Sequence, residues 1–384
     1  MKCEKIYGRM TRMIVMDVKL DNFLSFKNFH MNMSYPKKIV GSYIENENLS
    51  GYPNFRYKKV NILMGANATG KTSFGKMLMS IFNFMDKKQY ERLAEDIGDT
   101  SKEASFSIDF IGDKNILYRV ETKITPLTEE KYSNKNIEVV VKSMPIRAKD
   151  SYETCLERLK NSKQEKCENY IEELEKVTGL SWLFCYTEDY GKARVLDTPK
   201  NNKKYTRILE YTLKALDPAI CKVEKSSEVD NTYIIRTSNK NVIIQDGKMV
   251  NGDLLSSGTK AGIEVAGMVA SIRERECSFY YCDEKFSCIH SDIEKAVLAV
   301  MINSLEENDQ IFFTTHNTEI LELPLPKHAF VFLKKDVNNE EQPIECISAS
   351  SLLKRNTDSL KRAVENDLFS VAPATDLIYE IENL

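Results

Sequence analysis

A glycine-rich segment at residues 65–73 holds the residue types that can bind a phosphate chain. It consists of Gly65, Ala66, Asn67, Ala68, Thr69, Gly70, Lys71, Thr72 and Ser73, and its first eight residues fit the pattern G-x-x-x-x-G-K-[ST]. The glycines let the loop wrap closely round a phosphate, so that backbone N–H groups point inward. We expect Lys71 to reach the β- and γ-phosphates and Thr72 to bind Mg²⁺. The segment therefore predicts a site for ATP and Mg²⁺.

Two acidic residues follow an apolar run further along the chain. Residues 279–282 have the composition of a buried strand, and Asp283 and Glu284 come directly after them. If this strand neighbours the one before the phosphate loop, Asp283 would hold Mg²⁺ through water, and Glu284 would polarise the attacking water. Acids at strand ends also serve as structural caps, so the catalytic interpretation depends on the phosphate loop.

A serine–glycine turn and a histidine complete the candidate residues. Ser256 and Gly258 open a predicted helix, with Gly258 25 residues before Asp283, and His316 ends an apolar run 33 residues after Asp283. Taken alone, the turn is a helix N-cap and the histidine is structural. With a γ-phosphate nearby, His316 would be a sensor that hydrogen-bonds it. The turn is a second anion site, but it cannot reach the phosphate that residues 65–72 already enclose.

The elements that must position these residues alternate between strands and helices. An apolar run at 60–64 precedes the phosphate loop, and apolar residues at helical spacing follow it at 71–85. Further strands are predicted as a pair within 14–34, then at 106–110, 116–120, 139–141, 233–237, 242–245, 279–282 and 311–314, with a final one at 329–333. Further helices are predicted at 207–216, 259–273 and 292–306. This order predicts an α/β fold with a mixed central sheet and an antiparallel β layer.

The middle of the chain carries two charged stretches. Residues 151–177 combine mixed charges with apolar residues at helical spacing, which predicts one or two amphipathic helices. We interpret 150–180 as a helical lobe inserted into a single head that spans 1–384. Residues 192–207 hold six basic residues and one acid, Asp197. This stretch is either a solvated loop or a contact for nucleic acid or a partner protein.

Length and composition exclude several classes of protein. A chain of 384 residues can bury a sizeable core, and its net charge of −3 argues against a generally basic nucleic-acid binder. No apolar run approaches the roughly 18 residues of a membrane helix, so we expect no membrane partner. Nine cysteines without a CxxC pair favour a reducing compartment, which predicts a cytoplasmic protein.

In order and spacing, the four motifs resemble the ATP-binding-cassette type of ATPase head found in SMC proteins and recombination ATPases. Residues 255–259, Leu-Ser-Ser-Gly-Thr, look like the signature motif of that group, which closes over the γ-phosphate bound to the partner subunit. The resemblance implies a P-loop NTPase head and two ATP molecules held between two copies of the chain. Ser256 and Gly258 would then act in trans. The residues that would act in cis are Lys71, Thr72, Asp283, Glu284 and His316.

Residues 283–290 resemble one particular group of these ATPases. They read Asp-Glu-Lys-Phe-Ser-Cys-Ile-His and are similar to the DE-x-F-x-S-x-L-H stretch of bacterial standalone AAA-type ATPases, which include the overcoming-lysogenization-defect ATPases. Segments 22–26, 315–321 and 354–360 also resemble that group, so the likeness runs from about residue 13 to residue 368. Two features depart from the pattern. We find no convincing Q-loop glutamine, and Ser257 replaces the first glycine of the commonest signature.

The resemblance implies Mg-dependent ATP hydrolysis by a head that forms a homodimer or a higher homo-oligomer. The chain ends 68 residues after His316 (384 − 316), which leaves no room for an appended Toprim nuclease, so we expect a separately encoded effector protein. Our first hypothesis is the regulatory or sensor ATPase of a bacterial anti-phage defence system. The alternatives are a DNA repair or maintenance ATPase that clamps DNA, and an assembly scaffold that ATP locks.

Overall fold

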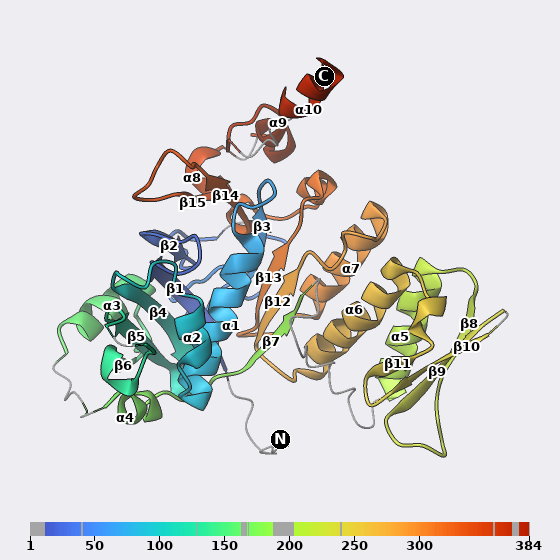
Figure 1. Cartoon of the computed structure of the whole chain (residues 1–384), viewed down its shortest axis with the longest axis horizontal. Helices are drawn as coiled ribbons and strands as arrows, with labels where there is room; N and C mark the ends of the chain where they lie inside the picture. Colours follow the sequence, from blue (N-terminus) through green and yellow to red (C-terminus); the bar gives the residue numbers. More distant parts are fainter. Residues whose placement is uncertain are drawn as a thin grey trace.

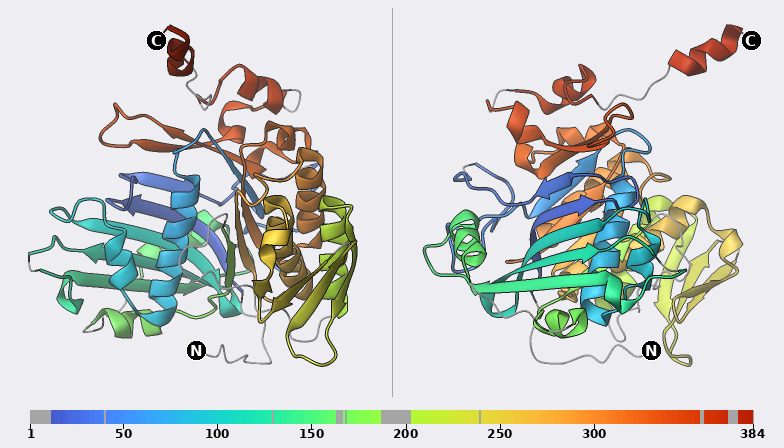
Figure 2. Two further views of the ribbon diagram at one scale, coloured as in Figure 1. Left: turned by 45° about the vertical axis from the view of Figure 1, so that its right-hand side comes forward. Right: turned by 60° about the vertical axis from the view of Figure 1, so that its left-hand side comes forward.

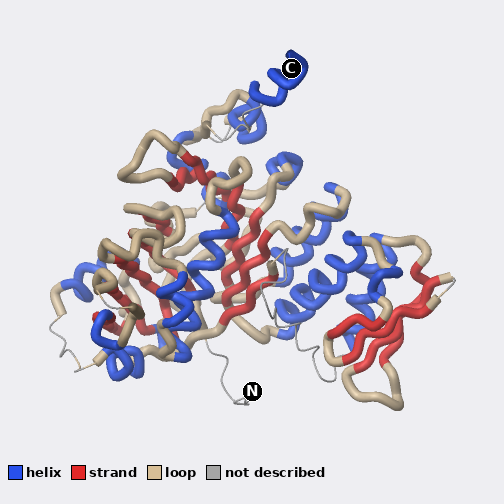
Figure 3. Tube along the Cα trace, viewed as in Figure 1, coloured by secondary structure: helices blue, strands red, loops and turns tan. Residues whose placement is uncertain are grey.

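The computed structural model describes residues 12–39, 41–128, 130–162, 167, 169–186, 203–238, 240–355, 358–370 and 376–383. These residues form three β-sheets with helices between and beside them (Figure 1). A five-stranded and a four-stranded sheet lie on opposite sides of a six-stranded central sheet, and Figure 3 shows the three groups of strands in red. The predicted α/β class with a mixed central sheet and an antiparallel layer is confirmed.

The central sheet has the strand order β15-β14-β3-β13-β12-β7. Its strands are β3 (Val60–Met64), β7 (Trp182–Cys185), β12 (Phe279–Asp283), β13 (Gln310–Thr314), β14 (Phe330–Lys335) and β15 (Ile344–Ser348). All neighbours are parallel except β14 and β15. Every residue of β3, β12 and β13 is buried, as expected for a sheet covered on both faces. The prediction that the strand at 329–333 is the last one is wrong, because β15 follows and pairs with β14.

Helices cover the two faces of the central sheet. They are α1 (Lys71–Lys87) on one face and α6 (Ser257–Glu274) and α7 (Ser291–Ser304) on the other. The views of Figure 2 place α1 between the central and the five-stranded sheet. Because successive side chains of a strand point to opposite faces, Tyr281 of β12 packs on the α1 side, and Tyr280 and Cys282 pack on the α6 side.

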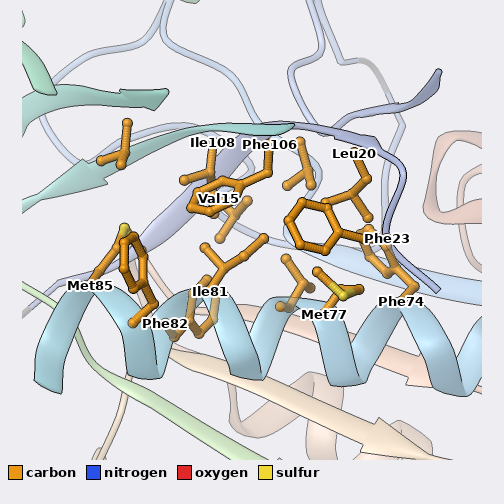
Figure 4. Packing of buried hydrophobic residues seen from close by; sticks show 14 of the residues in the cluster. Val15, Leu20, Phe23, Phe74, Met77, Ile81, Phe82, Met85, Phe106 and Ile108 are labelled. Carbon is orange, nitrogen blue, oxygen red and sulfur yellow. The ribbon is translucent and has the colours of Figure 1, made fainter. Parts of the chain in front are cut away.

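The five-stranded sheet is antiparallel and has the order β2-β1-β4-β5-β6. Its strands are β1 (Ile14–Asp21), β2 (Phe29–Asn32), β4 (Ala104–Gly112), β5 (Ile116–Ile124) and β6 (Ile137–Pro145). Its inner face packs against α1, and Figure 4 shows Val15 and Phe106 facing Ile81 across this layer. The helix α2 (Glu91–Glu95) follows α1.

The helical lobe predicted at 150–180 corresponds to two short helices. They are α3 (Tyr152–Lys160) and α4 (Tyr170–Glu175), and both lie against β6. Leu159 of α3 and Leu174 of α4 are buried there, so each helix is amphipathic as predicted. The helices therefore cover the antiparallel sheet, and their status as a separate lobe stays a prediction.

The four-stranded sheet, which we call the side sheet, is antiparallel with the order β11-β10-β9-β8. Its strands are β8 (Ile220–Lys225), β9 (Thr232–Thr237), β10 (Asn241–Gln245) and β11 (Lys248–Val250). One face packs on α5 (Lys203–Leu216) and on α6, through residues such as Ile235, Leu213 and Ala266. The sequence predicted α5, β9 and β10. It did not predict β8, β11 or the sheet that the four strands form.

The segment after β15 contains the short helices α8 (Ala349–Leu352), α9 (Leu360–Glu365) and α10 (Asp376–Tyr379). Phe369 stacks on Phe332 of β14 with ring centroids 4.0 Å apart, which joins the residues after α9 to the central sheet. The 3₁₀ helices are η1 (Asp113–Asn115), η2 (Asn134–Asn136), η3 (Gly252–Leu254), η4 (Thr318–Glu322), η5 (Lys327–Ala329) and η6 (Glu380–Asn383). Among the described residues, no helix combines the length and apolar character needed to cross a lipid bilayer.

Candidate active site

The loop between β3 and α1 is a tight turn that requires glycine at both ends. Gly65 has a φ of +152°, and a Cβ atom there would lie 2.5 Å from the Leu333 carbonyl oxygen. Gly70 has a φ of +99°, and a Cβ atom there would press on Phe26 and Ile344. A larger residue would strain the backbone at either position, and at Gly65 it would also collide with the Leu333 carbonyl group. The loop that the sequence predicts to bind phosphate is thus a tight turn that leads directly from β3 into the N-terminus of α1.

The Lys71 side chain is buried and folds back onto this loop. Its Nζ donates hydrogen bonds to the carbonyl oxygens of Gly65 (2.8 Å) and Ala66 (3.0 Å), and it lies 3.4 Å from Glu284 Oε1. Burial lowers the pKa of Lys71, and the nearby charge of Glu284 opposes that shift. The ammonium group is thus surrounded by acceptors whose place the oxygens of a triphosphate can take.

Asp283 at the end of β12 joins the phosphate loop to β13. Its Oδ2 accepts a hydrogen bond from the Thr72 hydroxyl and its Oδ1 accepts one from the Thr314 hydroxyl, both at 2.8 Å. Burial raises the pKa of Asp283, although both hydrogen bonds act in the opposite direction. A carboxyl group that is almost fully buried and faces a hydroxyl is well placed to share a metal ion with it.

Glu284 and His316 form a second contact beside Lys71. His316 Nε2 lies 2.8 Å from Glu284 Oε1, and Glu284 adopts a φ of +44°, which turns its side chain away from the path of β12. Burial alone would raise the pKa of Glu284, but the hydrogen bond with His316 and the charge of Lys71 outweigh it, so the pKa lies below its usual range. Glu284 is therefore held as a carboxylate at neutral pH.

This set of groups fits a triphosphate bound to Mg²⁺. Mg²⁺ prefers hard oxygen ligands, and Thr72 and Asp283 offer a hydroxyl and a carboxylate that already touch. When bound, Mg²⁺ would neutralise charge on the phosphate oxygens. The residues predicted to act in cis lie together at the carboxyl ends of β3, β12 and β13, and they are Lys71, Thr72, Asp283, Glu284 and His316.

Comparisons with known proteins give one consistent result. No protein-family model matches the sequence, and no curated protein does so either. A solved SMC head bound to the C-winged helix domain of ScpA is 13% identical, covers 89% of this chain and 99% of its own, and superposes with a TM-score of 0.51. A second solved structure is an SMC head domain with an extended coiled coil, bound to the C-terminal domain of ScpA derived from Pyrococcus furiosus. It is 12% identical, and the match covers 89% of this chain and 98% of the solved one, with a TM-score of 0.52. The chain has an SMC head-like fold.

The two residues predicted to act in trans lie at the start of α6 in this SMC head-like fold. Ser256 is the N-cap, and its Oγ accepts a hydrogen bond of 3.1 Å from the Thr259 amide. A Cβ atom at Gly258 would lie 2.8 Å from the Cys288 carbonyl oxygen, so the turn packs on the segment after Glu284. In the described part of the chain, the hydrogen bonds of Ser256 stay within its own helix. The motif is thus not joined to the phosphate loop of the same chain.

Three residues of the site were not singled out from the sequence. Thr314 bridges Asp283 and the Glu284 amide. Glu294 of α7 accepts hydrogen bonds from Thr315 (2.6 Å) and Asn317 (2.8 Å), which fixes the turn that carries His316. The polar residues on either side of His316 were a signal for such a partner, but nothing in the sequence indicated Glu294. The third residue is Tyr281, whose contacts with α1 are described below.

Part of two predicted stretches lies outside the described residues. Of the basic stretch 192–207, only residues from 203 onward are described, and they begin α5. Of the segment 354–360, residues 356 and 357 are not described. The choice between a solvated loop and a nucleic-acid or partner contact at 192–207 therefore stays open.

Proposed function

We propose that this chain is an ATPase that binds Mg-ATP in the loop at residues 65–72 and hydrolyses it. The observation that supports this most strongly is the meeting of Lys71, Thr72 and Asp283 with Glu284 and His316 at the ends of three neighbouring parallel strands. These groups come from three separate stretches of sequence. Together they supply a cation for the phosphates, two oxygen ligands for a metal, a carboxylate and a γ-phosphate sensor.

The chemical step follows from the positions of these groups. Glu284 would orient a water molecule whose oxygen bonds to the γ-phosphorus, while the bond from that phosphorus to the bridging oxygen of ADP breaks. One proton of the water passes to the Glu284 carboxylate, and the products are ADP and phosphate. Lys71, which now faces Glu284, would turn to the phosphate oxygens and so free the carboxylate for this role.

The complete site is proposed to need two copies of the chain. Ser256 and Gly258 start a helix, where backbone N–H groups and the helix dipole favour an anion. In the proposed dimer they cover the γ-phosphate held by the partner's loop, and the homodimer closes over two ATP molecules. Among the described residues, no hydrogen bond of Ser256 reaches the phosphate loop of its own chain, which supports an action in trans.

The variant Glu284→Gln tests this proposal. It should retain Mg-ATP, lower the turnover number at least about 100-fold, and accumulate as an ATP-bound dimer. Phosphate release and light scattering with and without ATP measure the two effects. Glu228→Gln, which alters an exposed acid beside the side sheet, serves as the matched control and should behave like the unmodified protein. Monomers that turn ATP over at the normal rate would refute the two-chain site.

The cellular role that we propose is the regulatory ATPase of an anti-phage defence system, acting on a separately encoded effector. The similarity of residues 283–290 to the standalone ATPases supports this role. In both solved SMC heads the head is bound to a domain of ScpA, which supports a partner on another polypeptide. Phage plating on cells that carry this gene with its neighbouring reading frame tests the role. Glu284→Gln should abolish protection, and equal protection by that variant would contradict it.

The basic stretch at 192–207 favours a second candidate, an ATPase that clamps DNA. Binding of duplex DNA that weakens steeply with salt would support this candidate, because released counterions make phosphate contacts salt-dependent. A preparation that forms a stable oligomer with ATP but binds no DNA would instead support the regulatory role.

A further inference from the structure

The hydroxyl group of Tyr281 reaches into the first turn of α1. It donates a hydrogen bond of 2.8 Å to the Lys71 carbonyl oxygen, and the Tyr281 ring lies against the backbone of Gly75. In a regular α-helix the carbonyl of residue i and the amide of residue i+4 bond to each other directly. Tyr281 therefore binds the carbonyl group of the first turn after the phosphate loop, and its ring lies beside Gly75, the residue whose amide is the regular helical partner of that carbonyl.

The absence of a side chain at Gly75 makes this contact possible. A Cβ atom at Gly75 would lie 2.5 Å from Cε1 and 2.8 Å from Cζ of Tyr281, which is closer than atoms can approach. Glycine inside a helix is unfavourable by about 1 kcal/mol relative to alanine, so its presence here needs a reason. The Tyr281 ring occupies the space that a side chain would fill.

The ring itself is held in place by the central sheet. Tyr281 is fully buried and lies in register with Phe184 of β7 and Phe312 of β13. Its centroid is 5.5 Å from that of Phe184 and 5.8 Å from that of Phe312, and both rings are stacked on it. The hydroxyl group thus connects β12, whose last residue is Asp283, to the helix turn that carries Lys71 and Thr72.

We infer that Tyr281 is a positioning residue that sets the first turn of α1, and with it Lys71 and Thr72, relative to Asp283. This inference rests on the proposed ATPase function for its consequence in catalysis, but the positioning itself is a property of the chain alone. Without the hydroxyl group, the first turn can shift relative to β12. The contact between Thr72 and Asp283 then loses its fixed geometry, and hydrolysis should suffer more than ATP binding.

Tyr281→Phe tests the inference, and the chain offers a matched control one residue away. Tyr280 is also fully buried, but its hydroxyl donates its proton to the carbonyl oxygen of Cys277 (2.6 Å), with that of Ser271 at 3.3 Å, on the opposite face of the sheet. Tyr280→Phe therefore removes a comparable hydrogen bond without touching α1. Both variants should lose a similar amount of thermal stability.

The two variants should differ in two other measurements. In Tyr281→Phe without nucleotide, hydrogen exchange of the Gly75 amide should become about tenfold faster, and kcat should fall about tenfold while the Kd for Mg-ATP changes little. Tyr280→Phe should leave both the exchange and kcat unchanged. Gly75→Ala should also lower kcat. The double variant with Tyr281→Phe should lose less activity than the two single losses combined, because both changes disturb the same contact.

Two results would overturn the inference. One is wild-type exchange and wild-type kcat in Tyr281→Phe, and the other is an equal loss of kcat in Tyr280→Phe, which would show a general effect of destabilisation. If the unmodified protein neither binds nor hydrolyses Mg-ATP, the proposed function fails. The exchange measurement on the nucleotide-free chain then still decides whether Tyr281 positions α1.

Discussion

The central sheet and the side sheet are both rich in apolar residues, but they differ in how they are covered. Every residue of β3, β12 and β13 is buried between α1 on one face and α6 and α7 on the other. Among the described residues, one face of the side sheet is covered by helices, and β10 alternates between buried positions and more exposed ones. In a sheet covered on both faces, polar side chains that bind ligands are accessible at the ends of the strands. The candidate site lies there.

This difference explains the arrangement of the motifs. The cis residues lie at the end of β12 or in the segments that follow β3, β12 and β13, whereas Ser256 follows the side sheet and opens α6. The side sheet packs on α5 and on Ala266 and Ala270 of α6, so it braces the helix whose first turn is proposed to meet a second copy. The central sheet thus builds the proposed nucleotide site, and the side sheet supports the proposed contact with the partner.

Lys71→Ala should have the largest effect and is confined to the central sheet. The change removes a buried cation that would face the β- and γ-phosphates, so affinity for ATP should fall by at least about 100-fold. Titration with a fluorescent ATP analogue measures it. Lys87→Ala, an exposed lysine in the last turn of the same helix, is the control and should bind normally. Equal affinity of the two variants would show that the loop is not the nucleotide site.

Ile235→Ala should destabilise the side sheet without altering the proposed nucleotide site. Ile235 is fully buried, and its truncation should lower the free energy of unfolding by about 3 kcal/mol. Ile243→Ala, at a half-buried position of β10, should cost less than about 1 kcal/mol. Because α6 contributes to the cores of both sheets, we expect one unfolding transition for the whole chain.

The single tryptophan allows this expectation to be checked. Trp182 lies in β7 of the central sheet, so its fluorescence follows that sheet, whereas far-UV circular dichroism follows all three. Both signals should shift to the same lower midpoint of chemical denaturation in Ile235→Ala. An early phase seen by circular dichroism alone would show that the two regions unfold separately.

Asp309→Asn should have a smaller, pH-dependent effect at the other end of the central sheet. Burial raises the pKa of Asp309 from 3.8 to about 6 in the folded chain. The folded state therefore binds this proton more tightly than the unfolded state, and the resulting stability is present below pH 4 and lost as the pH rises through 6. The variant should gain about 2 kcal/mol relative to the unmodified protein between pH 4 and pH 7.

Chemical denaturation at several pH values measures that gain, and ATP turnover at pH 7 should be unchanged because Asp309 precedes β13 rather than following it. A difference in stability that is constant with pH would show that Asp309 does not titrate in this range.

The cis residues could be predicted because each lies in a short contiguous motif at the end of an apolar strand. The side sheet could not, since β11 has only three residues and is exposed throughout, and the pairing of β8 with β9 shifts register near Ile220, which breaks the alternation of β8. β15 was missed for a related reason, because its pairing with β14 is what makes it a strand. Tyr281 looked like one more apolar strand residue. Only the structure shows that its hydroxyl group reaches Lys71 across 210 positions of sequence.

The most direct test of the central claim is the Mg²⁺ dependence of ATP binding in the unmodified protein and in Asp283→Asn. If the phosphate loop and the end of β12 meet around one metal-bound triphosphate, the unmodified chain binds one ATP per chain and binds it more tightly with Mg²⁺. The variant should keep the weaker Mg-free binding through Lys71 and lose the gain from Mg²⁺. An unchanged gain from Mg²⁺ in the variant would contradict the claim.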